Sequence, residues 1–328
     1  MSKHKEKSRK KLSIIIPFYG QRASELAIPL ASINCQTGID FKQVDVHLVN
    51  DGGEPLELSH LAIFKNLDLH YHELPENVGP GLARQYGIDH SEGEFIMFID
   101  SDDSLFGALD LLQFFNSFQN PGKLQVIASN FLIEGKKNGA SIFRMISPND
   151  TMFSMSVVAK CYKRQFLENV GLRFRPELRF FEDSYFAHLA LVFTENIVAL
   201  QAMTYLARYR LGSETRKNNH AAGHDLGKFV LSCRLKLEKV QEVTPTLLGE
   251  HLETMLSSIF LKQKRQAPTD ENQFKQEFQR LLAEFPYDWQ ANLARLQGIV
   301  NAESQRAGSS YNATDTTGLR EFFEKYSA

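Results

Sequence analysis

The 328-residue sequence predicts an α/β protein, in which helices cover both faces of a mostly parallel central sheet and a C-terminal helical region follows. Three observations support this class. Short apolar runs, typical of strands that are buried on both faces, recur along the first part of the chain. Helical segments separate these runs, as in proteins whose neighbouring strands are parallel. Beyond about residue 215 the apolar residues change to helical spacing.

The expected elements can be taken in chain order. The segments that we expect to form strands are 12–16, 44–49, 67–74, 95–99, 125–133, 141–146, 197–200 and 204–210. The helices that we expect in the same region are 23–35, 82–90, 105–118 and 185–193. The C-terminal stripes of apolar residues, which we expect to be core, are 226–240, 252–260 and 274–289. Residues 302–315 are polar and are predicted to be a linker.

These elements predict three parts of the chain. Residues 1–11 form a basic tail, residues 12–215 a domain of alternating strands and helices, and residues 216–328 a C-terminal helical region. A homodimer through the C-terminal helices is one interpretation of their aromatic stripes, and packing against the sheet domain is the other.

Three carboxylates follow the apolar run 95–99 at once: Asp100, Asp102 and Asp103. Like charges this close raise each other's pKa unless a cation or hydrogen bonds keep them ionised. The carboxyl ends of the strands are also where open α/β sheets bind ligands. A hard divalent cation that bridges to substrate phosphates would explain the cluster. The alternative is a turn and helix N-cap, an interpretation that suits Asp103 better than the other two.

Composition and charge limit the classes of function. With 37 Lys and Arg against 39 Asp and Glu, the formal net charge of −2 gives no support for a nucleic-acid partner. Three cysteines lie far apart and lack metal-ligand spacing, as expected in a reducing compartment. No apolar run approaches the ~20 residues that cross a bilayer. We therefore expect a cytoplasmic protein.

The basic tail leaves two interpretations open. A disordered, solubilising end is the simpler one. The other is weak association with an anionic membrane surface, at about 1 kcal/mol per basic residue, which would make the protein peripheral at the inner face of the membrane. We favour the first, because stable anchoring usually requires a second signal.

With these pieces placed, the chain resembles the family 2 glycosyltransferases, which have the A-type nucleotide-sugar-binding fold. The order and spacing of five stretches carry the resemblance, and together they cover about residues 12–215. These stretches are 12–19, 50–53, 77–87, 92–103 and 157–183. The helical remainder has no counterpart in the resemblance.

The resemblance implies a nucleotide-sugar donor and assigns residues to it. Asp51 would hydrogen-bond the base, usually uracil, and Arg84 lies on a helix below the nucleotide. Asp100 faces the ribose side. The nucleotide-sugar-binding residues that the resemblance implies are Pro17, Tyr19, Asp51, Asn77, Gly79, Arg84 and Asp100.

The resemblance also implies the reaction's metal and base. Asp100 and Asp102 correspond to the family's metal-binding pair, with Asp102 the more direct ligand of Mn²⁺ or Mg²⁺. Asp183 corresponds to the general base of inverting members. The alternative for Asp183 is an N-cap before the helix that follows it, a role compatible with catalysis.

Two departures from the family pattern matter most. Gly20 stands where a polar asparagine usually follows Tyr19. Family members often carry a histidine shortly after the Tyr-Arg of the last strand, whereas here Leu211 follows Arg210. His220 or His224 would be substitutes, and the alternative is that both lie on the surface. Positive charge could instead come from the residues Arg210, Arg216 and Lys217.

The expected function is therefore metal-dependent, inverting transfer of a hexose or N-acetylhexosamine from a nucleotide diphosphate sugar, UDP-sugar first. The acceptor would be a hydroxyl of a glycan, a lipid-linked sugar or a protein, as in polysaccharide biosynthesis. One alternative is a non-catalytic member of the fold that binds nucleotide-sugar or scaffolds a partner. Another is a sugar-phosphate nucleotidyltransferase, which we disfavour because Pro17–Gln21 is not a Gly-rich phosphate loop.

Overall fold

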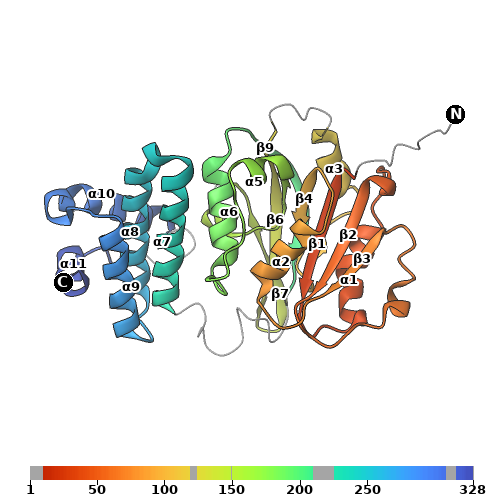
Figure 1. Ribbon diagram of the computed structural model, residues 1–328, viewed down its shortest axis with the longest axis horizontal. Helices are drawn as coiled ribbons and strands as arrows, with labels where there is room; N and C mark the ends of the chain where they lie inside the picture. The colour runs from red at the N-terminus through yellow and green to blue at the C-terminus, as the bar shows by residue number, and fades with distance from the viewer. Residues whose placement is uncertain (1–9, 119–123, 149, 210–224, 308–314, 328) are drawn as a thin grey trace. The chain divides into compact units, whose positions relative to one another are not determined.

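The computed structural model describes residues 10–118, 124–148, 150–209, 225–307 and 315–327. The chain divides into two compact units, Met1–Arg210 and Leu211–Ala328. The first, called here the sheet unit, is a nine-stranded sheet with helices on both faces, and the second, the helical unit, consists of helices (Figure 1). The predicted fold class is confirmed. The predicted boundary between residues 215 and 216 lies outside the described residues.

The sheet is parallel in its first half and mixed in its second. Its strands are β1 (Leu12–Phe18), β2 (Val44–Asn50), β3 (Leu69–Glu73), β4 (Phe95–Phe98), β5 (Ser104–Leu105), β6 (Val126–Lys137), β7 (Ala140–Ile146), β8 (Lys160–Lys163) and β9 (Ile197–Ala207). They lie in the order β3-β2-β1-β4-β8-β6-β9-β5, and β7 pairs with β6. Strands β3, β2, β1 and β4 are mutually parallel, whereas β8 runs antiparallel to both β4 and β6.

The helices of the sheet unit follow the predicted alternation, with two corrections. They are α1 (Ala23–Asn34), α2 (Pro80–Asp89), α3 (Asp110–Ser117), α4 (Thr151–Met155), α5 (Arg164–Asn169) and α6 (Glu182–Phe193), with 3₁₀ turns η1 (Phe41–Gln43) and η2 (Leu58–Leu61). The helix expected from residue 105 begins at Asp110, because Ser104 and Leu105 pair with β9 instead. The two strands expected between 197 and 210 form the single strand β9, which pairs with β6 across a register shift.

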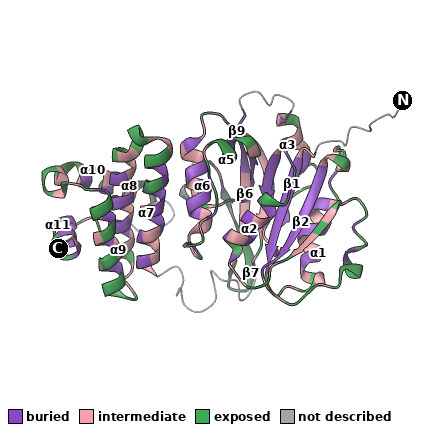
Figure 2. Cartoon of the chain, viewed as in Figure 1, coloured by how far each residue is buried: buried purple, intermediate pink, exposed green. Residues whose placement is uncertain are grey.

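Buried parallel strands form the centre of the sheet unit. Every residue of β1, β2 and β4 is buried. In Figure 2, β1 and β2 are drawn in the purple of buried residues. Helix α2 packs closely on β1, since a Cβ at Gly87 would lie 2.5 Å from Ile15 Cγ2. The glycine therefore sets the distance between α2 and the sheet, and α2 carries Arg84.

The helical unit has a core of its own. Its helices are α7 (Leu226–Val243), α8 (Leu248–Arg265), α9 (Glu271–Glu284), α10 (Trp289–Ala307) and α11 (Leu319–Tyr326), with the 3₁₀ turn η3 (Pro245–Leu247). The predicted apolar stripes meet in this core, around the fully buried aromatic residues Phe260, Phe274, Phe278 and Phe323. Residues 302–307 continue α10 and so do not belong to a linker, while 308–314 lie outside the described residues. No described helix is long and apolar enough to cross a membrane.

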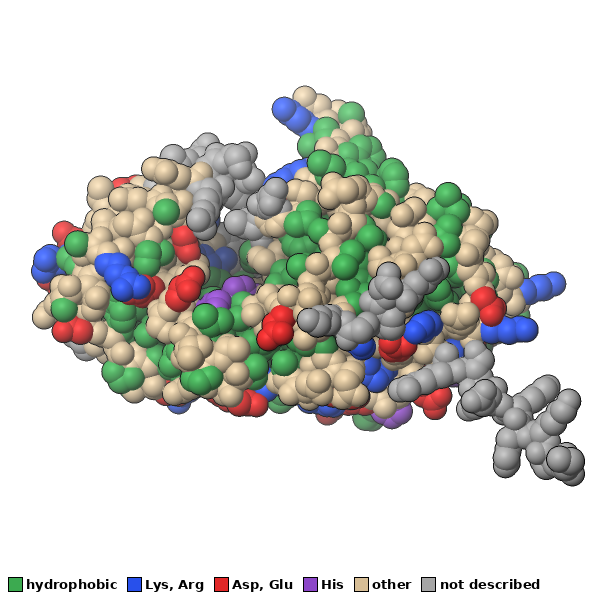
Figure 3. All heavy atoms as spheres, turned by 90° about the horizontal axis from the view of Figure 1, so that it is seen from above, with side chains coloured by type: hydrophobic (Ala, Val, Ile, Leu, Met, Phe, Trp, Pro, Cys, Tyr) green, Lys and Arg blue, Asp and Glu red, His purple; other side chains and the backbone are tan. Residues whose placement is uncertain are grey.

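Strand β1 begins at Leu12, as predicted, and the two basic residues before it contact acidic side chains of the sheet unit. Residues 1–9 of the basic tail lie outside the described residues. Lys10 Nζ lies 2.6 Å from Asp68 Oδ2, and the Lys11 ammonium pairs with Glu94. These two residues are therefore held by side chains that lie just before β3 and β4. Acidic and basic side chains are interspersed over the face drawn in Figure 3, in keeping with a net charge near zero.

Candidate active site

The predicted site residues come from the carboxyl ends of the parallel strands. Strand β4 ends at Phe98, and the chain then turns, with the Asp103 N–H donating to the Asp100 carbonyl at 3.1 Å. In the register of the sheet, Ile15 of β1 pairs with Phe98, and Phe18 pairs with Asn50 of β2. The carboxyl ends of β1, β2 and β4 therefore meet at one edge of the sheet, as predicted.

The three carboxylates after β4 have different environments. Asp103 is buried; one of its oxygens accepts from the Tyr205 hydroxyl at 2.7 Å and the other from the Arg208 N–H at 2.8 Å. Burial, with Asp100 nearby, raises the pKa of Asp103 well above its usual range. This residue thus holds β9 to the strand end and does not cap a helix. The side chain of Asp100 is 34% exposed and Asp102 is partly buried, so both face the open edge.

A buried guanidinium connects two of the predicted roles. Arg84 on α2 donates to Asp100 Oδ1 at 2.7 Å and to Asp183 Oδ1 at 2.6 Å, while Glu182 Oε1 lies 3.6 Å away. These carboxylates raise the pKa of Arg84 despite its burial. The arginine therefore stays charged, and it holds the predicted metal ligand and the predicted base in one cluster.

The predicted base lies in the first turn of a helix. Helix α6 begins at Glu182, after Phe181 in a left-handed conformation (φ 64°), so Asp183 is inside the helix and is not its N-cap. Burial raises the pKa of both Glu182 and Asp183, and the Arg84 charge opposes this rise. A carboxylate whose pKa is raised towards neutrality is a more effective general base than an ordinary aspartate.

Asp51 connects the end of β2 to the start of α2. Its oxygens accept from the N–H groups of Val78 at 2.8 Å and Gly79 at 2.9 Å. Gly79 has φ 94°, a conformation that side chains disfavour, and precedes the first residue of α2. Each carboxylate oxygen retains a lone pair for a further donor. The structure thus brings together Asp51 and Gly79, as predicted for the base-binding end.

The remaining predicted donor residues surround the same strand ends. Pro17 lies in β1 and Tyr19 follows it, 58% exposed. The Tyr19 ring lies against the turn after β2, 3.5 Å from where a Cβ of Gly53 would be. The Asn77 amide oxygen accepts from the Arg179 guanidinium. Arg179 is therefore a further cation at this edge, and it was not among the residues predicted from the sequence.

Two buried residues close to the site were not among those predicted from the sequence. The Tyr205 hydroxyl accepts from the Asp100 N–H at 3.1 Å and donates to Asp103. The fully buried Lys160 of β8 donates to the carbonyls of Phe153 at 2.8 Å and Ser156 at 2.9 Å. A single lysine in the apolar run 157–162 was a signal for the second of these. The predicted substitutes for the absent histidine and its charge lie outside the described residues. They are His220, His224, Arg210, Arg216 and Lys217.

Residues 13–169 match the family described as Glycosyl transferase family 2. The sheet unit belongs to this family. Family 2 membership was the resemblance predicted from five short stretches, and it is confirmed. The family match ends before Asp183, so the role of that residue still rests on the geometry of the Arg84 cluster.

Curated relatives are named as glycosyltransferases, and solved structures share the fold. Poly(ribitol-phosphate) beta-N-acetylglucosaminyltransferase TarS of Staphylococcus aureus is 25% identical over 205 residues, 60% of this chain and 35% of TarS. The crystal structure of S. aureus TarS 1-349 in complex with UDP-GlcNAc has a TM-score of 0.66 at 21% identity, covering 96% of this chain and 91% of that one. The mannosyltransferase PcManGT from Pyrobaculum calidifontis, in complex with GDP-Man and Mn2+, has a TM-score of 0.52 at 12% identity, covering 92% and 83%.

These similarities do not identify the substrate of this chain. At the identities of the two solved structures, the similarity shows a shared fold. The chain spans about a third of the length of the curated relative TarS. The substrate of this chain therefore has to be argued from its own site.

Proposed function

We propose that the protein is an inverting, metal-dependent glycosyltransferase that moves a sugar from a UDP-sugar to a hydroxyl of a glycan or glycoconjugate. One observation carries the proposal. The buried Arg84 joins Asp100, at the donor end of the sheet, to Asp183 on a different element. A leaving-group site and a base site are thereby held side by side, as a displacement reaction requires.

The donor proposal follows from the strand ends. Asp51, fixed by two backbone N–H groups, offers lone pairs to the N–H of a base such as uracil. Tyr19, Asn77 and Gly79 lie on the loops around it, and Arg179 brings positive charge to the same edge. The TarS structure was solved with UDP-GlcNAc, so UDP-GlcNAc is the first donor to test.

The side chains at the end of β4 fit a hard divalent cation. Asp100 and Asp102 offer carboxylate oxygens, which Mn²⁺ and Mg²⁺ prefer, at the partly exposed edge. Both Asp103 oxygens are already hydrogen-bonded, so we assign the ion to Asp100 and Asp102 alone. When bound there, the cation supplies charge stabilisation for the departing diphosphate.

In this proposal Asp183 is the catalytic base. Its carboxylate takes the proton of the acceptor hydroxyl while that oxygen forms a bond to the anomeric carbon. The bond from this carbon to the diphosphate breaks on the opposite face, so one displacement inverts the configuration. Arg84 orients Asp183 through the 2.6 Å hydrogen bond. Glu182 packs beside Gly81 on α2, which supports a positioning role for Glu182.

The test is nucleotide release from a donor panel in the presence of Mn²⁺. We expect UDP to be released from UDP-GlcNAc or another UDP-sugar, and chelation of the metal to stop this release. The Asp183→Asn variant should bind UDP as the unmodified protein does but lose turnover, whereas Asp102→Asn should lose metal-dependent UDP binding. A matched control is Asp89→Asn, whose carboxylate pairs with the exposed Arg173 at 2.6 Å.

Each alternative function gives a distinct outcome. UDP binding without release from any donor or acceptor would favour a non-catalytic nucleotide-sugar-binding protein. Pyrophosphate release from a nucleoside triphosphate and a sugar phosphate would favour a nucleotidyltransferase. Near-normal turnover in Asp183→Asn would remove Asp183 from the base role. Poly(ribitol phosphate) is the first acceptor to test, because the name of the TarS relative specifies it.

A further inference from the structure

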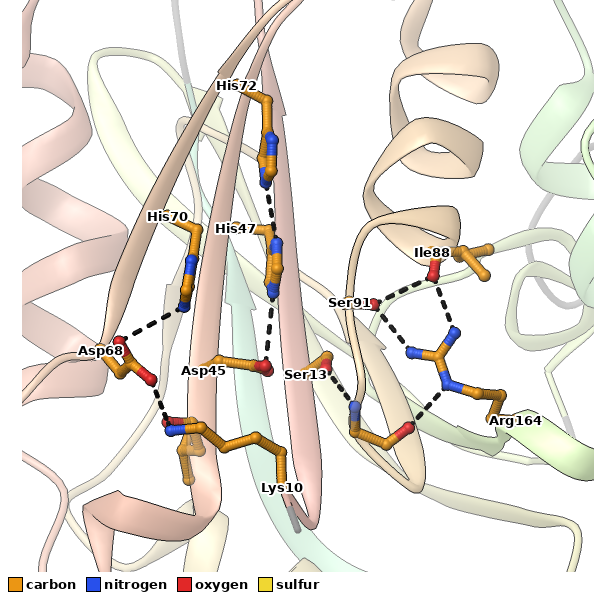
Figure 4. Close-up of polar contacts among 12 residues, drawn as sticks. Lys10, Ser13, Asp45, His47, Asp68, His70, His72, Ile88, Ser91 and Arg164 are labelled. Atoms are coloured by element: carbon orange, nitrogen blue, oxygen red, sulfur yellow. Dashed lines mark hydrogen bonds and ion pairs between the residues drawn. The ribbon is translucent and has the colours of Figure 1, made fainter. Parts of the chain in front are cut away.

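A second group of metal-binding side chains lies at the opposite end of the same strands. Asp45 and His47 are two positions apart along β2, so their side chains point to the same face of the sheet. His70 of β3 is the direct cross-strand partner of His47 and shares that face (Figure 4). Asp45 lies six residues before Asp51, about 20 Å along an extended strand. The group is therefore separate from the proposed donor site.

The three side chains converge closely. One ligand atom from each of Asp45, His47 and His70 lies within 4.8 Å of the others. The rings of His47 and His70 are stacked, with centroids 4.8 Å apart, and His47 Nε2 lies 3.4 Å from Asp45 Oδ2. Small rotations of the side chains would bring these atoms to one ion, since zinc–nitrogen and zinc–oxygen distances are about 2.0–2.2 Å.

Two buried polar atoms in this group have no hydrogen-bond partner, although a long ion-pair contact of 3.4 Å joins His47 Nε2 to Asp45 Oδ2. These atoms are Asp45 Oδ1 and His47 Nε2, in side chains that belong to residues 4% and 2% exposed. Buried polar atoms are nearly always paired, because leaving one unpaired costs about 1–3 kcal/mol. Both residues line an open pocket together with His70, so an ion from solvent could reach them. The missing partner fits a cation held between carboxylate and imidazole.

The surroundings of the group resemble the outer shell of a metal site. His47 Nδ1 lies 2.9 Å from His72 Nε2, so His47 can donate its N–H there and turn the Nε2 lone pair towards Asp45. Metal-binding histidines commonly use their second nitrogen in this way. Asp68 Oδ1 lies 3.3 Å from His70 Nε2, and Lys10 holds the other oxygen of Asp68. Asp68 is thus placed to hold His70 from the outer shell, and water would take a fourth position on the ion.

We propose that Asp45, His47 and His70 bind a divalent transition-metal ion of the Zn²⁺ class. Two imidazoles and one carboxylate suit Zn²⁺, whereas Mg²⁺ prefers oxygen ligands alone. The bound ion ties β3, the edge strand of the sheet, to β2. It is distinct from the ion assigned to Asp100 and Asp102, and the proposal does not rest on glycosyl transfer.

The test is Zn²⁺ titration of the whole 328-residue chain, without a tag, by competition with a chromophoric chelator. We expect one ion per chain, with Asp102→Asn binding it equally well. His70→Gln should weaken Zn²⁺ affinity by at least about 10- to 100-fold. Loss of an outer-shell partner alone costs about this much in known sites. His70 is half-exposed, so this variant should fold. The matched control is His60→Gln, an exposed histidine outside the group.

Two further readouts decide the nature of the site. Co²⁺ in place of Zn²⁺ should give the visible absorption of a tetrahedral site in the unmodified protein and in His60→Gln, but not in His70→Gln. A hundredfold excess of Mg²⁺ should not displace the Zn²⁺. Zinc binding that is unchanged in His70→Gln, or no binding at micromolar Zn²⁺, would overturn the proposal, whatever the outcome of the UDP-release assay.

Discussion

At the scale of single residues, Arg84 is the side chain on which the proposed site depends most. Its guanidinium is buried and forms short hydrogen bonds to Asp100 and Asp183 in two directions. A lysine keeps the charge but lacks the planar fork that reaches both carboxylates. We expect Arg84→Lys to lower turnover by about 100-fold, the effect of a misplacement near 1 Å. UDP-release kinetics would measure it.

The control for Arg84 is an arginine in an exposed pair. Arg173 contacts Asp89 at 2.6 Å and is more than half exposed, so Arg173→Lys should change the free energy of unfolding by less than about 1 kcal/mol. Turnover should stay at the level of the unmodified protein. If Arg84→Lys behaved like this control, the bridge between donor and base would have no catalytic role.

The Tyr205 hydroxyl is the subject of a second prediction at the scale of single residues. Its hydroxyl joins the Asp100 N–H to the buried Asp103 carboxylate, and Tyr205→Phe leaves both without this partner. We expect the free energy of unfolding to fall by about 1–3 kcal/mol, measured by chemical denaturation. Tyr19→Phe removes an exposed hydroxyl and should stay within about 0.5 kcal/mol. Equal losses in the two variants would contradict a structural role for Tyr205.

At the scale of elements, the turn after β2 sets the position of Asp51. Gly52 has φ 70°, and a Cβ there would lie 2.2 Å from the backbone carbon of Glu76. Left-handed strain alone costs about 1–2 kcal/mol for a residue with a side chain. We expect Gly52→Ala to lower the free energy of unfolding by more than this, because its methyl group must also displace the backbone. UDP affinity should fall too, since the displaced loop precedes Val78 and Gly79. Calorimetric titration with UDP and Mn²⁺ would measure this loss.

The comparison for Gly52 is a glycine with the same conformation in open space. Gly139 has φ 81° with no atom within 4 Å of an added Cβ. Gly139→Ala should therefore lose only the stability that left-handed strain costs, and it should bind UDP as the unmodified protein does. Similar destabilisation in the two variants would mean that the contact with Glu76 relaxes at little cost.

Elements were predictable where local pattern alone decides them. The runs at β1, β2 and β4 and the acidic segment after β4 are explicit in the sequence, because a buried parallel strand is continuously apolar. The start of α3 could not be predicted in this way, because Ser104 and Leu105 pair with β9, a strand that is distant in the sequence. Tertiary pairing of this kind overrides local helix propensity.

The site was predictable in its residues but not in its connections. The family resemblance supplied the roles of Asp100 and Asp183, but the Arg84–Asp183 contact spans 99 positions and no local pattern reports it. The histidine group was missed for another reason. Alternation along 67–74 correctly predicted a strand, but it does not show that the polar face of β3 meets the polar residues of β2.

At the scale of the whole molecule, each unit has a separate core and its own spectroscopic probe. The chain's single tryptophan, Trp289, lies in the helical unit and stacks on Phe323 with ring centroids 5.3 Å apart. Its fluorescence therefore reports unfolding of the helical unit alone. Far-ultraviolet circular dichroism reports both units, so the two signals together can separate their transitions.

This separation allows a test of where the donor binds. UDP with Mn²⁺ at a hundred times its Kd stabilises the unit that binds it by about 2.7 kcal/mol. In a unit of this size that should raise the melting temperature by about 5–10 °C. We expect the circular dichroism transition of the sheet unit to move by this amount, while the Trp289 transition stays in place. An equal shift of the Trp289 transition would mean that the helical unit takes part in donor binding, contrary to a site built only from β1, β2, β4, α2 and α6 of the sheet unit.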